Sequence, residues 1–377
     1  MPLRGVLRAA NFWIISLRSR RIFELLRLHP RSRFSASNSS HLTSRCASTI
    51  TDLQERSLLL KMRVASTAAE IETLRSVWDS LMSPNLSLFQ SHRWNLLAAK
   101  TFGEREQPYF IFAEDDNGAA ILPLAIDSRS RSLTFAGECL FDYRDYLAVG
   151  DPAPLCVAWQ RLASFNLPLS ITAICRPQEH VWERLPKTLF SRAPRLRKSE
   201  MTSDQLARNH PRAFSRLRKL ERMGLRIRQY SGDSPIVSGI YRLRTAQSSA
   251  NELFHDPRRA EFMIAACSTE ASRCEIFALE HGSTLAAALV TFRDADWRRF
   301  YTIFYDRQWA RFSPGVSLLF EIARRSLEQG INVDLMTGEQ PYKMRVAQSA
   351  QELFNVKATA AELRELFPAA AIADFAA

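Results

Sequence analysis

Ser313, Pro314 and Gly315 stand directly before a strongly amphipathic stretch, and residues 299–305 before them read as a strand. The first amides of a helix have no partners inside it, and the helix dipole adds positive charge there, so a strand-to-helix turn of this kind can hold an anion. Glycine allows close approach to the backbone, and proline removes only an N–H that would lack a partner. We therefore predict a phosphate-binding turn formed by Ser313, Gly315, Val316 and Ser317, with Arg311 adding charge-assisted hydrogen bonds.

This triplet also has an ordinary interpretation, because serine before proline is a common helix start. The residue types alone do not decide between the two interpretations. Other kinds of site are easier to exclude. The six cysteines show no C-x-x-C pair and no zinc-ligand spacing with histidine, and the chain has no G-x-S-x-G motif. We expect no metal.

The second half of the chain predicts a regular series of elements. Hydrophobic periodicity and turn residues give strands and helices in the order β-α-α-β-β-β-α-β, followed by a further strand. The final helix of the series presents one apolar face and ends at Gly330. The predicted strands cover 225–230, 275–279, 285–292, 299–305, 333–336 and 353–359, and the helices cover 236–250, 257–268 and 313–330.

The first half predicts the same order with few matching residues. Its strands are expected at 63–65, 109–113, 119–125, 132–136 and 169–174, and its helices at 67–81, 91–101 and 154–165. Two copies of one α/β unit are the simplest account. We predict an α/β fold with a mixed sheet, built from tandem units that are each a twisted, mostly antiparallel sheet flanked by helices.

Length and composition agree with two domains of this kind. The chain has 377 residues, of which 46% are hydrophobic and 24% charged, which excludes collagen, a coiled coil and a polytopic membrane protein. The net charge of +12 is uneven. Residues 1–61 hold eleven basic and three acidic residues, and the remainder holds forty and thirty-six. We expect 1–61 to be a disordered basic leader or a mis-assigned start, 62–195 the first unit and 196–377 the second.

Residues 208–226 hold the densest run of positive charge in the second half. Arg212, Arg216, Lys219 and Arg222 recur at helical spacing, with apolar residues on the opposite side. The ordinary interpretation is a solvated helix face. The alternative is contact with a phosphate-bearing partner: the 3′-phosphate of a coenzyme, a nucleotide sugar or tRNA.

The predicted element order, with an anion-binding turn after the fourth strand, resembles the GNAT acyltransferase superfamily. The second half is similar to its CelD-type branch, which is related to the FemAB transferases and associated with bacterial cellulose and polysaccharide synthesis. The resemblance covers about residues 62–360. It is carried by Phe304–Asp306, Ser313–Leu319, Asp334, Gly338–Glu339 and Tyr342–Lys343, and in the first half by Phe89–Ser91, Trp94, Leu122–Leu124 and Asp142–Tyr146.

The resemblance implies direct transfer of an acyl group from a thioester to an amine, with acetyl-CoA as donor. That reaction needs a base for the acceptor ammonium and an acid for the departing thiolate. We predict Glu339 as the base and Tyr342 as the acid, with Asp306 and Lys343 binding substrate. The structural alternative is that Glu339 is a surface carboxylate paired with Lys343 and that Tyr342 is a packing residue.

The resemblance thus implies an acyl-CoA-dependent N-acyltransferase of polysaccharide biosynthesis, whose acceptor is a sugar amine or other small amine, and we expect it to be cytoplasmic. The first copy is expected not to bind coenzyme A, because Asp151 places a carboxylate at its equivalent helix start. Two alternatives remain open: a FemAB-like transferase that uses aminoacyl-tRNA, and a catalytically idle scaffold that binds coenzyme A. No transmembrane segment is expected, and the oligomeric state is not predicted.

Overall fold

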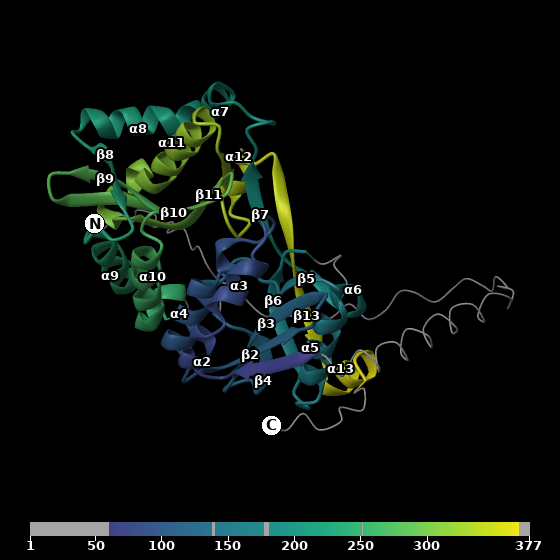
Figure 1. Cartoon of the computed structure of the whole chain (residues 1–377). Coiled ribbons are helices and arrows are strands. Elements are labelled where there is room, and N and C mark those ends of the chain that lie inside the picture. The colour runs from purple at the N-terminus through teal and green to yellow at the C-terminus, as the bar shows by residue number, and fades with distance from the viewer. Residues whose placement is uncertain (1–59, 138–139, 177–180, 251, 369–377) are drawn as a thin grey trace, which may run out of the picture. The chain divides into compact units, whose positions relative to one another are not determined.

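The computed structural model describes residues 60–368 apart from 138–139, 177–180 and 251 (Figure 1). The predicted leader therefore lies almost wholly outside the described residues, as do Cys46 and Cys139. The four described cysteines, Cys156, Cys175, Cys267 and Cys274, are free thiols. Among the described helices, none combines the length and the apolar character needed to cross a membrane.

The first copy begins with an edge strand and two helical segments. Thr67 starts the first of them through a capping box with Glu70, and Ser91 caps the longer helix α4. Asp115 accepts from the amides of Asn117 and Gly118 in the turn between the next two strands. The elements are β1 (Lys61–Ala65), α2 (Ala68–Glu72), α3 (Arg75–Leu81), η1 (Leu88–Gln90), α4 (His92–Phe102), β2 (Glu106–Glu114), β3 (Gly118–Asp127), β4 (Ser132–Phe135), β5 (Leu147–Gly150), α5 (Ala153–Ala163) and β6 (Leu169–Ile174).

The second copy follows after a connecting region that contains α6 (Val181–Arg184), β7 (Lys187–Leu196) and α7 (Ser203–Asn209). Asp256 caps α10 through the amide of Arg258, as its place before Pro257 indicates. The elements are α8 (Pro211–Arg222), β8 (Arg226–Ser231), α9 (Ile236–Gln247), η3 (Leu253–His255), α10 (Pro257–Thr269), β9 (Cys274–His281), β10 (Thr284–Asp294), β11 (Trp297–Tyr305), η4 (Arg307–Phe312), α11 (Pro314–Glu328), β12 (Asn332–Asp334), α12 (Pro341–Val346), β13 (Ser349–Ala358) and α13 (Ala360–Leu366).

The two copies pair their strands in the same way. In the first, β1–β2, β2–β3 and β3–β4 are antiparallel and β4–β6 is parallel. In the second, β8–β9, β9–β10 and β10–β11 are antiparallel and β11–β12 is parallel. Each parallel pair is joined through a helix, α5 or α11, as parallel pairing requires. The predicted fold, a tandem mixed α/β arrangement, is confirmed.

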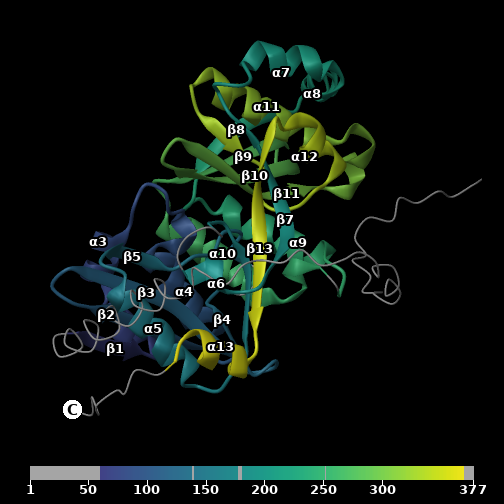
Figure 2. The same ribbon diagram turned by 90° about the vertical axis from the view of Figure 1, so that its right-hand side faces the viewer.

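Two long strands join the copies into one sheet. β13 pairs with β6 of the first copy on one side and with β7 on the other, and β7 pairs with β12 of the second copy. In Figure 2, β13 is seen as one long strand beside β7. The last strand of the chain therefore completes the sheet next to the first copy.

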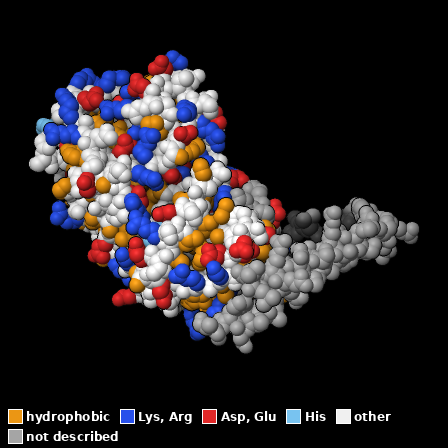
Figure 3. All heavy atoms as spheres, viewed as in Figure 1, with side chains coloured by type: hydrophobic (Ala, Val, Ile, Leu, Met, Phe, Trp, Pro, Cys, Tyr) orange, Lys and Arg blue, Asp and Glu red, His pale blue; other side chains and the backbone are white. Residues whose placement is uncertain are grey.

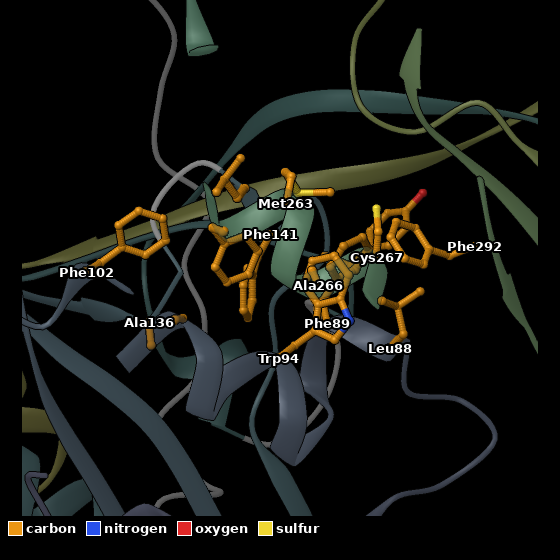
Figure 4. Packing of buried hydrophobic residues seen from close by; sticks show 14 of the residues in the cluster. Leu88, Phe89, Trp94, Phe102, Ala136, Phe141, Met263, Ala266, Cys267 and Phe292 are labelled. Atoms are coloured by element: carbon orange, nitrogen blue, oxygen red, sulfur yellow. The ribbon is translucent and has the colours of Figure 1, made fainter. Parts of the chain in front are cut away.

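One hydrophobic core is shared by both copies (Figure 4). Trp94 on α4 makes edge-to-face contacts with Phe262 on α10 and Phe292 on β10, at centroid distances of 5.5 and 5.4 Å. Phe102, which lies on α4 like Trp94, stacks on Phe262. Aromatic pairs of this kind stabilise beyond their buried area, so α4 and α10 hold the copies together.

The structure differs from the predicted elements in three places. The helix expected over 67–81 is interrupted at Thr73–Leu74 and forms two short helices. The strand expected over 333–336 ends at Asp334, because Met336 has a left-handed φ of 60° that a strand cannot contain. β5, α6, β7, α7, α12 and α13 are additional elements that the hydrophobic pattern did not show.

Candidate active site

Strands β11 and β12 part soon after they begin to pair. Only Trp297–Arg299 of β11 pairs with Asn332–Asp334 of β12. Next to this point the register of β10 and β11 shifts between Val290 and Thr291, so that Tyr301 is an extra residue. A bulge increases local twist and ends regular pairing. The rest of β11 thus has no strand partner on the β12 side, and the Arg244 guanidinium (α9) donates to the Ile303 carbonyl oxygen at 2.9 Å.

The start of α11 lies against this part of β11. A methyl group built on Gly315 would come 3.3 Å from the side chain of Ile303 and 3.6 Å from Cβ of Tyr305. Ser313 adopts a left-handed conformation with φ 50°, and its side chain does not cap the helix. The helix starts at Pro314, as the ordinary interpretation of Ser313–Pro314 predicts, but without a hydrogen bond from the Ser313 side chain.

The first amides of α11 are consequently left without hydrogen-bond partners in the described part of the chain, although Gly315 itself is a buried residue. Among the described residues, neither the Gly315 nor the Val316 N–H has a hydrogen-bond partner, whereas the Ser317 amide already donates to the Ser313 carbonyl oxygen. The Ser317 hydroxyl is buried and has no described partner either. An uncovered first turn is what an anion would need.

The equivalent helix of the first copy is closed by its own side chain. The Asp151 carboxylate accepts from the Ala153 amide at 2.8 Å at the start of α5. A negative charge already occupies this helix start, and it would repel a phosphate. The two copies thus share a fold but differ at this turn.

Positive side chains flank the α11 turn. The Arg311 guanidinium lies 4.6 Å and the Lys219 ammonium 5.2 Å from the ring centroid of Phe312, so two cations contact the residue just before the turn. Lys219 belongs to α8, whose apolar residues pack on α11 and whose Lys and Arg side chains gather on the outside (Figure 3). None of the five exposed cations of α8 forms an ion pair within the described part of the chain. They are Arg212, Arg216, Arg218, Lys219 and Arg222.

The residues predicted for acid–base chemistry lie in different surroundings. Tyr342, the second residue of α12, is half-buried against the apolar cluster that includes α11, and burial raises the pKa of its hydroxyl. Glu339 is exposed, and its nearest charge is Arg192 at 3.9 Å. The expected surface pairing of Glu339 with Lys343 is not formed.

The predicted substrate-binding residues also differ in role. The Asp306 carboxylate accepts from the Gln308 amide at 2.9 Å and starts η4. Lys343 is 9% exposed, and its ammonium donates to the Thr337 carbonyl oxygen at 2.9 Å. The Lys343 side chain is therefore more buried than that of Asp306.

A buried polar network lies where β11 and β12 separate. The Asp334 carboxylate accepts from the Tyr143 hydroxyl at 2.6 Å and from the Arg299 guanidinium at 2.8 Å, with Arg195 at 3.3 Å. Arg299 also donates to Asp294 at 2.7 Å. Tyr143 comes from the first copy, so this network fixes the copies against each other beside the site.

Asp142 is the neighbouring residue that the sequence did not single out as functional. Its carboxylate accepts a hydrogen bond from the Thr337 hydroxyl, and the Lys343 ammonium donates one to the Thr337 carbonyl oxygen. Burial raises the pKa of Asp142 to about 6 against the opposing effects of Thr337 and Lys343, and burial lowers the pKa of Lys343 to about 8. Shifted pKa values of this size are typical of functional sites. The contact spans 195 residues, so no local pattern shows it.

The structure therefore brings the predicted residues together in two groups. Ser313, Gly315, Val316, Ser317 and Arg311 lie at the α11 turn, and Tyr342 packs against the same apolar cluster as α11. Glu339, beside Arg192, belongs to neither group. Lys343 belongs to a second group with Asp142 and Thr337. Two surface hollows, of about 680 and 230 Å³, are lined by no residue of either group. Within the described residues there is no cluster of three or more metal-ligating side chains.

Residues 208–344 match the model of the family described as an acetyltransferase (GNAT) domain. This segment contains every site residue predicted from the sequence. No curated protein matches the chain.

Solved structures are similar in fold. The C-terminal domain of a putative lysylphosphatidylglycerol synthetase from Agrobacterium fabrum has a TM-score of 0.50 and 11% identity, over 80% of this chain and 96% of that one. FemX has a TM-score of 0.50 and 9% identity, over 81% and 99%. A tandem GNAT protein from the clavulanic acid biosynthesis pathway has a TM-score of 0.47 and 10% identity, over 80% and 98%. At these identities the first two show the fold alone.

Proposed function

We propose that the chain is an acyl-CoA-dependent N-acyltransferase, with acetyl-CoA as the donor and a small amine or sugar amine as the acceptor. The observation that carries this proposal is the uncovered first turn of α11 beside the unpaired part of β11. The match of residues 208–344 to the GNAT domain supports it. A place in the CelD-type branch, a role in polysaccharide biosynthesis and a cytoplasmic location are part of the same proposal.

The donor would bind along the α11 turn. The Gly315 and Val316 amides would hold the diphosphate, with Ser313 and Ser317 beside them, and Arg311 would add charge. Asp151 closes the equivalent turn of the first copy, which is consistent with a single donor site in the second. The first unit, residues 62–195, would then support the site and complete its acceptor side.

The reaction would be a direct transfer. The acceptor nitrogen attacks the thioester carbonyl carbon, a C–N bond forms and the C–S bond breaks. Glu339 would take the proton that the ammonium loses, and Tyr342 would give a proton to the departing thiolate. Asp306 and Lys343 would contact substrate. The Tyr342 hydroxyl carries its proton at neutral pH, as the acid role requires, although burial raises its pKa and so makes it a weaker acid.

Calorimetric titration with coenzyme A tests the donor site. Gly315→Glu places a carboxylate at the turn and should weaken binding at least about tenfold, since one lost charge-assisted contact is worth about 1.5–3 kcal/mol. Gly315→Ala separates the steric effect, because a Cβ there meets only flexible side-chain atoms of Ile303 at close range. Gly239→Glu is the matched control, since a Cβ at Gly239 meets nothing within 4 Å.

Unchanged affinity in Gly315→Glu would place the phosphates elsewhere. Binding of coenzyme A without turnover of acetyl-CoA over a panel of amines would favour the idle scaffold. A rate unaffected by Glu339→Gln would remove Glu339 as the base.

A second candidate function is a FemAB-like transferase whose donor is aminoacyl-tRNA. The observation that favours it is the outer face of α8, whose cations are exposed and lack ion pairs near the α11 turn. Residues 197–228 hold ten basic and three acidic residues, whereas the rest of 62–377 holds thirty and thirty-three. Binding of tRNA that falls steeply with salt, together with no heat for coenzyme A, would favour this candidate over the first.

A further inference from the structure

Thr337 is contacted by two opposite charges from different copies. Asp142, in the segment between β4 and β5, accepts from the Thr337 hydroxyl, and Lys343 on α12 donates to the Thr337 carbonyl oxygen at 2.9 Å. The carboxylate and the ammonium do not form an ion pair with each other within 4 Å. Both charged groups therefore bind Thr337 without a direct ion pair between them.

Each charge retains unused hydrogen-bonding capacity. The Lys343 ammonium has three donors and one acceptor among the described residues, and the Asp142 carboxylate accepts one hydrogen bond there although it has several lone pairs. Buried charges are normally paired or fully hydrogen-bonded, because desolvation without compensation is costly. Lys343 is 9% exposed and Asp142 is half-buried, so neither side chain is completely removed from solvent.

The backbone around Thr337 is held in an unusual conformation. Met336 has a φ of 60°, and Gly338 has a φ of 112°. A non-glycine residue in this region costs about 1–3 kcal/mol and persists where the surroundings fix it, which is most frequent at functional sites. Here the Met336 amide is fixed by Asp334, whose carboxylate accepts from it at 2.9 Å.

We propose that Asp142 and Lys343 bind the acceptor, and that the acceptor is a zwitterion whose ammonium donates to Asp142 and whose carboxylate accepts from Lys343. The inference rests on the proposed function, since the ammonium held by Asp142 is the group to be acylated. Asp142 and Lys343 bind and orient the acceptor, and neither has to give or take a proton. The first copy thereby contributes directly to the acceptor site.

The protonation states of the two residues support this. Asp142 faces Lys343, Asp334 and Arg144, and Lys343 faces Asp142 and Asp334. With a pKa of about 6 for Asp142 and about 8 for Lys343, both are charged between these values. Binding of a zwitterion should therefore be strongest between about pH 6 and 8, and should weaken on either side.

Calorimetry with three matched probes tests the proposal. Alanine carries both charges, ethylamine lacks the carboxylate and propionate lacks the ammonium. Alanine should bind at least about tenfold more tightly than either, because each charged contact is worth about one decade or more. Lys343→Gln should weaken alanine about tenfold and leave ethylamine unchanged, and Asp142→Asn should weaken both amines.

The controls separate a binding role from a structural one. Lys357→Gln removes an exposed lysine of β13 and should change none of the three affinities. Thermal unfolding of each variant shows whether it is folded, and Asp142→Asn keeps an acceptor for the Thr337 hydroxyl. Alanine that binds no better than ethylamine, or not at all, overturns the inference, as does undiminished alanine binding by Lys343→Gln.

This inference and the proposed function fail differently. Alanine binding that depends on Lys343, without acyl transfer from acetyl-CoA, would contradict the proposed function alone. Equal acyl transfer to ethylamine and alanine would contradict the zwitterionic acceptor alone.

Discussion

Two residues that are not glycine have left-handed backbone conformations beside the proposed site. Ser313 precedes the α11 turn, and Met336 precedes Thr337 in the segment after β12. At Ser313 the side chain makes no capping hydrogen bond with the helix start. At Met336 this conformation ends β12 and is followed by Thr337, which contacts Asp142 and Lys343. In both cases local strain lies beside a proposed binding feature.

The ionised Asp142 should lower the stability of the protein at neutral pH. Its pKa is raised to about 6, so the folded chain binds a proton more tightly than the unfolded chain does, and this group stabilises the fold progressively as the pH falls from above 6 towards 4. Asparagine resembles the protonated acid. Asp142→Asn should therefore raise the free energy of unfolding by about 1–3 kcal/mol at pH 7.5, since one pKa unit is about 1.4 kcal/mol.

Urea unfolding at pH 7.5 and at pH 4.5 checks this, and the gain should shrink at the lower pH. A variant less stable than the parent at pH 7.5 would show that Asp142 is a structural charge. A stabilising substitution that abolishes alanine binding would identify a residue retained for function at the expense of stability.

Helices α5 and α11 occupy the same place in the two copies, but only α5 has a side-chain hydrogen bond at its start. α5 begins under the Asp151 carboxylate, and α11 begins without a side-chain cap. The turns differ at several residues, with Asp151 and Ala153 in the first copy where Ser313 and Gly315 stand in the second. Under the proposed function, only the second turn would accept an anion.

Truncation of Asp151 at the start of α5 and of Ser313 at the start of α11 should have unequal effects on the free energy of unfolding. Asp151→Ala leaves an amide of α5 without its partner and should lower the free energy of unfolding by about 1 kcal/mol. Ser313→Ala removes no capping bond and should cost less than about 0.3 kcal/mol. Chemical denaturation of both variants measures the difference. Equal losses would mean that Ser313 caps α11 in solution.

The sequence predicted most elements because their signals are local. Periodicity and capping residues located α4, α10 and α11, and the turn at Asp115–Gly118 located β2 and β3. β7 was missed because it pairs with β13, 154–169 residues away, and Pro194 weakens its strand pattern. The proposed phosphate-binding turn was predicted from Gly315, but its unpartnered amides depend on the φ of Ser313, and the proposed role of Asp142 depends on a contact with Thr337. Neither can be derived from neighbouring residues.

At the scale of the whole molecule, the two copies share their packing as well as their sheet. Trp94 of the first copy is buried against Phe262 and Phe292 of the second. The Asp334 network adds polar contacts from Tyr143. The residues that the structure describes should therefore unfold together.

Trp94→Ala tests this coupling. Removing a buried tryptophan leaves a cavity, and the free energy of unfolding should fall by about 3–5 kcal/mol. Because Trp94 contacts both copies, amide hydrogen exchange should show α4 and α10 losing protection together and to a similar extent. Loss of protection confined to the first copy would mean that the copies open independently.

The position of β13 constrains how the chain can fold during its synthesis. β6 lies 175 or more residues before the strand that covers its edge. While the ribosome is still making the second copy, that edge is exposed and open to pairing with the wrong strand. The nascent first copy can finish its sheet only after residues 349–358 have left the exit tunnel, because this late strand lies between two that were made much earlier.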